Sequence, residues 1–198
     1  MIQKTDRKIL AFYSPYPGAG KTTAAQYIQK TRPEFLGLSF ADTLRDIVSA
    51  VFYKTHHEDA AVYTEKDCPR VELDGHSYRD FLLAFGAAGR SLCPNIWVDC
   101  LKSDIESYMR NVYGIKGMVI DDLRFPNEYD MLREEGAKIV RIVNPGREIV
   151  PSEAETLLEC REFDAQLVND PLRGAGHYHA QLDALLATLW PGKDIQED

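Results

Sequence analysis

The chain has 198 residues, with a hydrophobic content of 44%, a charged content of 27% and a formal net charge of −8. This length fits one domain with a sizeable core, no apolar run approaches membrane-spanning length, and the negative charge argues against direct DNA binding over a broad surface. The spacing of the four cysteines fits neither a zinc pair nor a disulfide scaffold, and no signal-peptide core precedes the first strand, so we expect a cytoplasmic protein with reduced thiols.

The first predicted elements are a strand, a glycine-rich turn and a helix. Residues 8–13 form a short apolar run typical of a buried strand, and residues 21–30 are compatible with a helix that ends before Pro33. The turn between them reads SPYPGAGKTT. This pattern indicates a phosphate-binding P-loop, in which backbone N–H groups and the positive end of the helix hold a nucleotide triphosphate.

The predicted P-loop gives each residue of the turn a role in binding ATP. Lys21 would reach the β- and γ-phosphates, and the Thr22 hydroxyl would ligate Mg²⁺. The turn departs from the pattern G-x-x-x-x-G-K-[ST] at Pro15, which replaces the first glycine and changes the loop entry because proline has no N–H. The alternative is a strand-to-helix turn that binds nothing. The predicted ATP-binding residues of this turn are Gly18, Ala19, Gly20, Lys21, Thr22 and Thr23.

The next part of the chain is expected to be mostly helical. Residues 35–40 predict a second strand, and a helix begins at Ala41. Residues 54–74 are polar and predict a loop, and further helices are expected over residues 77–90 and 96–112. The apolar residues expected on one face of the helix after Ala41 are Leu44, Ile47, Val48 and Val51.

Charged residues in this helical part are candidates for an anion-binding site. Asp42 and Arg45 follow the second strand and could face one cleft, although a helix N-cap is the alternative for Asp42. Arg79 and Arg90 lie eleven residues apart, three helical turns on nearly one face, and could bind one anion. The alternative for both arginines is a solvated surface.

The second half of the chain alternates strands with helices. Residues 118–120 predict a strand that ends at Asp121 and Asp122, where a carboxylate can hold Mg²⁺ opposite the P-loop threonine. The alternative is that these acids only end the strand and that Arg124 pairs with one of them. The remaining expected elements are a helix over 127–135, a strand over 138–143, a charged loop over 146–163, a last strand over 166–168 and a helix over 177–189.

Alternating strands and helices with a P-loop after the first strand predict an α/β fold. Its central sheet would be parallel with helices on both faces, a three-layer α/β/α arrangement. Ligands of such folds bind at the carboxyl ends of the strands. The turn at 14–23 and the acids at 121 and 122 fall at such ends, so we expect them at one edge of the sheet.

Five segments in this order make the chain resemble the bacteriophage deoxynucleoside monophosphate kinases over residues 8–190: GAGKTT, FADTLRD, SYRDFLLAFG with Arg90, IWVD and DDLRFPNE. The resemblance implies a nucleoside-monophosphate-kinase fold over 1–198, with an acceptor-binding helical region at 41–112 and a lid-like segment at 146–163. The chain departs from this family at Thr43 and at Ala87-Ala88, which bears on base preference more than on the reaction.

The resemblance implies transfer of the γ-phosphoryl group of ATP to the 5′-phosphate of a dNMP, giving ADP and a dNDP for DNA synthesis. Such transfer needs positioning, exclusion of water and positive charge around the moving group, which Mg²⁺ and cationic side chains supply. Lys21 and Asp122 are implied to be catalytic, and Arg124 would contact the transition state or the acceptor phosphate. The implied metal ligands are Thr22, Asp121 and Asp122.

The same resemblance assigns the acceptor and the lid. Arg90 would hold the dNMP phosphate, Asp42 would contact the nucleoside, and Trp97 would either line the base pocket or pack in the core. Arg147 or Arg161 would belong to a lid that closes over ATP. The implied acceptor-binding residues are Asp42, Arg45, Arg79, Arg90, Trp97 and Arg124.

Two other functions are compatible with the residues. One is a P-loop kinase for another small phosphorylated acceptor, similar to the animal-type phosphomevalonate kinases or the dephospho-coenzyme A kinases. The other is a regulatory module that binds ATP and transfers no phosphate. The sequence does not decide the oligomeric state, for which a homodimer is one candidate, and a phage-encoded protein would work in the host cytoplasm.

Overall fold

The fold is that of a computed structural model, which describes residues 8–56, 67–146 and 156–191. Arg147, a candidate lid residue, lies outside these ranges. The chain divides into two compact units, residues 39–106 and the remainder on either side of them. We call them the helical unit and the sheet unit, and each has a hydrophobic core of its own.

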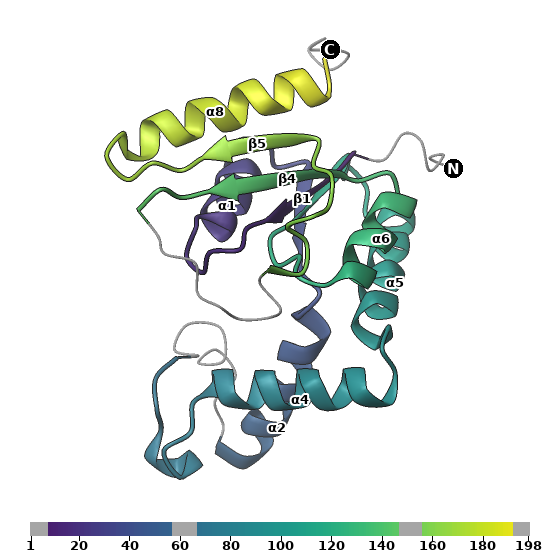
Figure 1. Ribbon diagram of the computed structural model, residues 1–198. Coiled ribbons are helices and arrows are strands. Elements are labelled where there is room, and N and C mark those ends of the chain that lie inside the picture. The colour runs from purple at the N-terminus through teal and green to yellow at the C-terminus, as the bar shows by residue number, and fades with distance from the viewer. Residues whose placement is uncertain (1–7, 57–66, 147–155, 192–198) are drawn as a thin grey trace. The chain divides into compact units, whose positions relative to one another are not determined.

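The sheet unit is built on a five-stranded sheet in which all neighbouring strands are parallel (Figure 1). The strand order is β2-β3-β1-β4-β5, so β1 lies in the centre. After Lys8, its sequence KILAFY is apolar and buried because a central parallel strand is covered on both faces. The strands are β1 (Lys8–Tyr13), β2 (Phe35–Leu38), β3 (Gly117–Ile120), β4 (Lys138–Val143) and β5 (Ala165–Val168).

Helices cover both faces of this sheet. α1 (Lys21–Thr31) connects β1 to β2, whereas α6 (Pro126–Glu134) connects β3 to β4 in the opposite direction across the sheet. Right-handed crossovers therefore place these two helices on opposite faces. α8 (Gly174–Leu189) packs beside α1, and both helices share a core with Leu10 and Phe12 of β1. The three-layer α/β/α fold expected from the sequence is confirmed.

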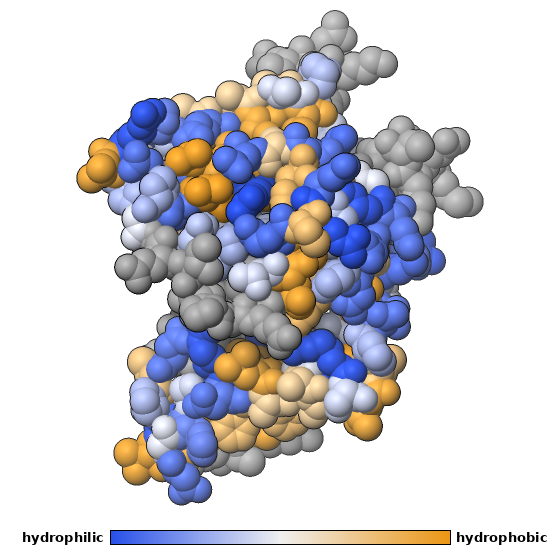
Figure 2. Space-filling view, in the orientation of Figure 1, coloured by the Kyte–Doolittle hydropathy of each residue, from blue (hydrophilic) through white to orange (hydrophobic). Residues whose placement is uncertain are grey.

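The helical unit contains α2 (Asp42–His56), a short 3-10 helix (Val71–Leu73), α4 (Tyr78–Leu92) and the first part of α5 (Ile96–Asn111). α4 begins at a capping box, in which Ser77 and Asp80 each bind the backbone of the other. Hydrophobic residues gather over α4 on the surface shown in Figure 2. The exposed large apolar side chains of this helix are Leu83, Phe85 and Leu92. The core residues of the unit are Leu44, Val48, Phe52, Leu73, Tyr78 and Trp97.

Two expectations from the sequence need correction. The buried stripe of α2 follows an i, i+4, i+8 spacing through Leu44, Val48 and Phe52, so Ile47 and Val51 are 41% and 45% exposed. The second strand ends at Leu38 instead of residue 40, because the following residues already form the start of α2. Among the described residues, no helix is long and apolar enough to cross a membrane.

Candidate functional site

The loop between β1 and α1 has the backbone of a phosphate-binding turn. Gly18 and Gly20 have φ angles of 67° and 104°, a region that residues with a side chain rarely adopt. Gly20 precedes the first residue of α1, and the first turn of this helix contains no acidic side chain. The backbone N–H groups at its start and its positive end are therefore suited to an anion. A Cβ at Gly20 would lie 2.4 Å from Nδ2 of Asn169, so only glycine fits there.

The entry to the loop accommodates proline at the position of the first P-loop glycine. Pro15 is buried, and the Oγ of the buried Ser14 accepts a hydrogen bond from the Tyr16 N–H at 3.2 Å. This hydrogen bond makes a side-chain turn around Pro15. Beyond it, Lys21 is half-buried, whereas Thr22 and Thr23 are exposed.

Two side chains from the C-terminal part of the chain bind the loop backbone. Nδ2 of Asn169 donates to the carbonyl oxygen of Ala19 at 2.8 Å, and the Tyr178 hydroxyl donates to that of Gly20 at 3.2 Å. Burial raises the pKa of Tyr178, which keeps this hydroxyl protonated. Neither residue was expected at the site from the sequence. Asn169 directly follows the last predicted strand, and this position alone indicated that the residue lies at this edge of the sheet.

The acids after β3 lie at the same edge of the sheet as the loop. β3 pairs in parallel with β1, with Ile120 opposite Ala11, so both strands end toward the same side. Asp121 and Asp122 follow directly and are half-buried. Within the described ranges, no group of three or more His, Cys, Asp and Glu side chains forms a metal cage. Mg²⁺ at nucleotide sites needs only one or two protein ligands beside phosphate oxygens, so the hydroxyl of Thr22 and these carboxylates fit that role.

Arg124 stands at the start of α6, where a buried acid fixes the backbone. Oε2 of Glu128 accepts the N–H groups of Arg124 at 2.8 Å and Phe125 at 3.0 Å, and Glu128 is 5% exposed. Pro126 begins the helix, where its missing N–H costs nothing. The segment DDLRFPNE thus encodes a helix start as well as candidate site residues, and the sequence analysis did not identify the capping role of Glu128.

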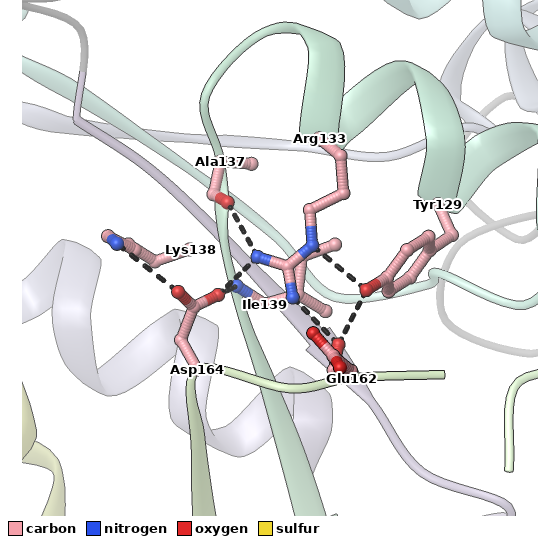
Figure 3. A network of polar contacts seen from close by, with 7 residues as sticks. All are labelled: Tyr129, Arg133, Ala137, Lys138, Ile139, Glu162 and Asp164. Carbon is pink, nitrogen blue, oxygen red and sulfur yellow. Dashed lines mark hydrogen bonds and ion pairs between the residues drawn. The ribbon is translucent and has the colours of Figure 1, made fainter. Parts of the chain in front are cut away.

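A polar network holds the segment after residue 155 against α6 and β4 (Figure 3). Asp164 accepts hydrogen bonds from Arg133 at 2.5 Å, from Lys138 at 3.2 Å and from the Ile139 N–H at 2.8 Å. The Tyr129 hydroxyl donates to the carbonyl oxygen of Glu162 at 2.5 Å. This network fixes the last part of the segment in which the sequence analysis placed a lid.

Arg161, the described lid candidate, lies against α6. Its Nη1 is 3.2 Å from Oδ1 of Asp130, and its guanidinium carbon is 5.2 Å from the centre of the Tyr129 ring. In this structure the side chain therefore takes part in the contacts of the segment with α6. Its role in a lid stays a prediction.

In the helical unit, Asp42 and Arg45 contact each other at the start of α2. Oδ2 of Asp42 accepts the Ser39 N–H at 2.7 Å, and Oδ1 lies 2.7 Å from Nη1 of Arg45. The same Arg45 nitrogen donates to the Ser39 hydroxyl at 3.1 Å. Asp42 is the first residue of α2 and accepts an N–H that lies three residues before it, so it is not the helix N-cap considered as an alternative. Its other oxygen orients the Arg45 guanidinium.

The two arginines of α4 have separate surroundings. α4 is continuous, so positions eleven residues apart are about 16 Å apart along its axis. Arg79 pairs with Asp67 on the exposed surface, while the Arg90 guanidinium lies close to Gly86 and is half-buried. The structure does not bring Arg79 and Arg90 together. Arg90 lies beside the buried Gly86, whereas Arg79 pairs with Asp67.

Trp97 is a core residue of the helical unit. It is 7% exposed, and its Nε1 donates to the carbonyl oxygen of Gly86 at 3.1 Å. A Cβ at Gly89 would lie 2.6 Å from the indole ring, so α4 and α5 are in close contact here. This placement matches the packing alternative of the sequence analysis.

The helical unit also contains an open pocket of about 420 Å³. Burial and the nearby Asp46 raise the pKa of Asp104 in its wall. Carboxylates and hydroxyls of this kind accept hydrogen bonds, so the pocket suits a ligand with N–H donors more than an anion. The sequence analysis did not identify it. The pocket is lined by Thr43, Cys93, Ile96, Asp99, Cys100, Ser103 and Asp104.

Comparison with known proteins identifies the family. No protein-family model matches the chain. The chain is 31% identical over 164 residues to a protein of Acanthamoeba polyphaga mimivirus described as a "putative deoxynucleotide monophosphate kinase". The alignment covers 77% of this chain and 84% of the viral protein. The chain belongs to the deoxynucleotide monophosphate kinase family. With the P-loop, this makes it a small-molecule kinase that uses ATP.

One solved structure agrees with the fold of this deoxynucleotide monophosphate kinase family member. A "putative kinase" from Chloroflexus aurantiacus has a TM-score of 0.50 at 14% identity, over 95% of this chain and 98% of the other. A sugar kinase from Janibacter sp. HTCC2649 has a TM-score of 0.46 at 18% identity, over 92% of this chain and 93% of the other. At these identities the first similarity shows the fold alone.

Proposed function

We propose that this protein is a deoxynucleoside monophosphate kinase that transfers the γ-phosphoryl group of ATP to the 5′-phosphate of a dNMP. The observation that carries the proposal is the loop before α1, whose two glycines with positive φ and lysine form a phosphate-binding turn in a chain of this family. The products are ADP and a dNDP. In a virus or bacteriophage, this reaction would supply precursors for DNA synthesis.

The sheet unit holds the donor in this proposal. The N–H groups of the loop and of the first turn of α1 bind the β- and γ-phosphates, and Lys21 adds a mobile positive charge. Thr22 and the carboxylates of Asp121 and Asp122 would hold Mg²⁺, which neutralises charge on the phosphate oxygens when it is bound. Arg124 contributes a further cation at the same edge of the sheet.

The helical unit holds the acceptor. Arg90 is the main candidate for the dNMP phosphate, and Arg45 is a second because Asp42 and Ser39 already orient its guanidinium. Thr43, the residue after Asp42, is one of the residues that line the pocket of the helical unit. This pocket would take the nucleoside, since its walls accept hydrogen bonds from N–H groups of a base. Trp97 would shape this unit through packing.

The reaction needs no covalent enzyme intermediate. A phosphate oxygen of the dNMP attacks the γ-phosphorus, the bond from that phosphorus to the β,γ-bridging oxygen breaks, and ADP leaves with the bond electrons. The attacking group is already an anion, so the enzyme needs no general base. Its contribution is positioning and positive charge in a site from which water is excluded.

The test is a coupled assay of ADP formation with ATP, Mg²⁺ and one acceptor at a time. The acceptors are the common dNMPs, phosphomevalonate and dephospho-coenzyme A. The proposal predicts ADP formation that depends on at least one dNMP. Turnover only with another acceptor would replace the proposed substrate class, and ATP binding without acceptor-dependent turnover would favour a regulatory module.

A further inference from the structure

We infer that Asn169 and Tyr178 are positioning residues of the phosphate loop, which aim the N–H groups of Gly20 and Lys21 at the donor phosphates by binding the carbonyl oxygens of Ala19 and Gly20. The inference rests on the donor half of the proposed function. It does not depend on the identity of the acceptor. It gives a positioning role to two residues that lie about 150 positions after the loop.

Peptide geometry links each carbonyl oxygen to the next N–H group. A trans peptide is planar, so its C=O and N–H bonds point in opposite directions. No cis peptide bond is present in the described ranges. When Asn169 binds the Ala19 oxygen, the N–H of Gly20 must therefore point away from Asn169. The Gly20 oxygen accepts the Tyr178 hydroxyl and the Ala24 N–H, and these two bonds together fix the N–H of Lys21 in the same manner.

The loop needs such support because glycine does little to fix its own conformation. Gly18 and Gly20 lack side chains and can adopt many backbone angles, and ordering them costs conformational entropy. An anion-binding turn is effective only if its N–H groups already converge before the ligand arrives. Contacts from outside the loop can supply this order.

Both supporting residues are themselves rigidly held. The Asn169 N–H donates to the Val143 carbonyl oxygen at 2.9 Å, which extends the pairing of β4 with β5 by one residue. Tyr178 is 2% exposed and belongs to the core shared by α1 and α8. The gap between Gly20 and Asn169 is too small for a Cβ, so the loop lies directly on this support.

The hydroxyl of Tyr178 can be removed without an obvious loss of fold. The Gly20 oxygen also accepts the N–H of Ala24 at 2.9 Å, the first hydrogen bond of α1. This oxygen therefore keeps a partner in Tyr178→Phe, and the aromatic ring keeps its packing. The variant isolates the contact that we assign to positioning.

The experiment measures the affinity for ATP with Mg²⁺ by calorimetry, without acceptor, in the full-length protein. Tyr178→Phe and Asn169→Ala should each raise the Kd about three- to tenfold, as expected for one lost hydrogen bond. Tripolyphosphate, which has the phosphates without the base, should lose affinity by a similar factor. In turnover, the KM for ATP should rise while that for the acceptor stays within about twofold.

Two matched controls separate positioning from general stability. Tyr27→Phe removes a hydroxyl on α1 that donates to Asp183 of α8 at 2.7 Å, and Gln181→Ala removes an amide side chain that binds the backbone of Val168. Each control should lower the melting temperature by as much as Tyr178→Phe or Asn169→Ala does. Neither control should change the affinity for ATP. Equal affinity losses in variants and controls would overturn the inference, because they would show an effect of stability alone.

The remaining outcomes are also decisive. Unchanged affinity in both Tyr178→Phe and Asn169→Ala, with a wild-type protein that binds ATP, would overturn the inference and leave the proposed function standing. Loss of ATP affinity with unchanged tripolyphosphate affinity would mean a contact with the nucleoside and would equally overturn it. A wild-type protein that binds no ATP would contradict the inference and the proposed function together.

Discussion

The indole N–H of Trp97 donates to the carbonyl oxygen of Gly86 at 3.1 Å, which joins the first turn of α5 to the middle of α4. The contact is possible because Gly89 has no side chain, since a Cβ there would lie 2.6 Å from the indole ring. Trp97 belongs to the core of the helical unit, and this unit also contains the candidate acceptor residues Arg45 and Arg90. Packing at this point therefore determines how α4 presents Arg90.

Gly89→Ala should destabilise the helical unit. The new Cβ would lie 2.6 Å from Cζ2 of Trp97, and the indole cannot yield without losing its bond to Gly86. We expect a loss of about 1–3 kcal/mol in the free energy of unfolding, measured by urea denaturation and followed by Trp fluorescence. Gly176→Ala is the matched control, because Gly176 lies in α8 with nothing within 4 Å of a built Cβ. This control should be neutral or stabilising by up to about 1 kcal/mol. Equal effects of both substitutions would contradict the packing account.

Asp164→Asn should lower stability at neutral pH and have less effect in acid. Burial opposes the charge of Asp164, but the Ile139 N–H and the cations of Arg133 and Lys138 outweigh it and lower the pKa of this carboxyl. A lowered pKa in the folded state stabilises the protein above the pKa of the unfolded state, about 3.9, and this contribution disappears as the pH falls through the folded-state pKa. We expect the free energy of unfolding to fall by about 2 kcal/mol at pH 7, and this difference from the wild type should shrink below about pH 4.

The control for this pH dependence is Asp130→Asn, measured by thermal denaturation over the same pH series. Asp130 is half-exposed in its pair with Arg161, so its removal should change the melting temperature little at any pH. If Asp164→Asn lowers the melting temperature as much at pH 3 as at pH 7, the result would be inconsistent with a stabilising ionised carboxylate.

Arg90→Ala should impair use of the acceptor. If Arg90 binds the dNMP phosphate, its loss should raise the acceptor KM at least tenfold and leave the Kd for ATP within about twofold, because a charge-assisted bond to phosphate is lost. Steady-state kinetics with varied dNMP and calorimetry with ATP measure the two effects. Arg32→Ala, at the exposed C-terminal end of α1, is a control that should change neither value. An unchanged acceptor KM in Arg90→Ala would remove this residue from the site.

Binding of the acceptor should protect two thiols from alkylation. Cys93, which is exposed, and the half-buried Cys100 line the pocket of the helical unit, whereas the exposed Cys68 and Cys160 do not line it. A dNMP that serves as substrate should slow the reaction of Cys93 and Cys100 with iodoacetamide several-fold, as read residue by residue by mass spectrometry. The other two thiols act as internal controls. Equal labelling of all four with and without the dNMP would place the nucleoside elsewhere.

The fold could largely be predicted from the sequence because its signals are local. Apolar runs in KILAFY and KIVRIV, punctuated by glycine and proline, marked buried parallel strands. The same local logic failed on α2, where periodicity could not tell which part of a wide apolar stripe faces the core. Ile47 and Val51 fall on its exposed part.

The candidate site was less predictable because its support comes from distant parts of the chain. The GAGKTT turn identified the loop from its own residues, but Asn169 and Tyr178 reach it only through the order of the strands and the packing of α8. Spacing along a helix suggested one anion for Arg79 and Arg90, while Asp67, which lies in another segment, pairs with Arg79. Sequence position alone carries no information about such partners.

Transfer of phosphate from ATP to a dNMP can be followed with γ-³²P-labelled ATP in a reaction with Mg²⁺ and the four common dNMPs. The account predicts that the wild-type protein forms labelled dNDP from at least one of them. Lys21→Ala, folded as judged by circular dichroism, should lower this rate by orders of magnitude. Label released only as inorganic phosphate, or full activity in Lys21→Ala, would contradict it.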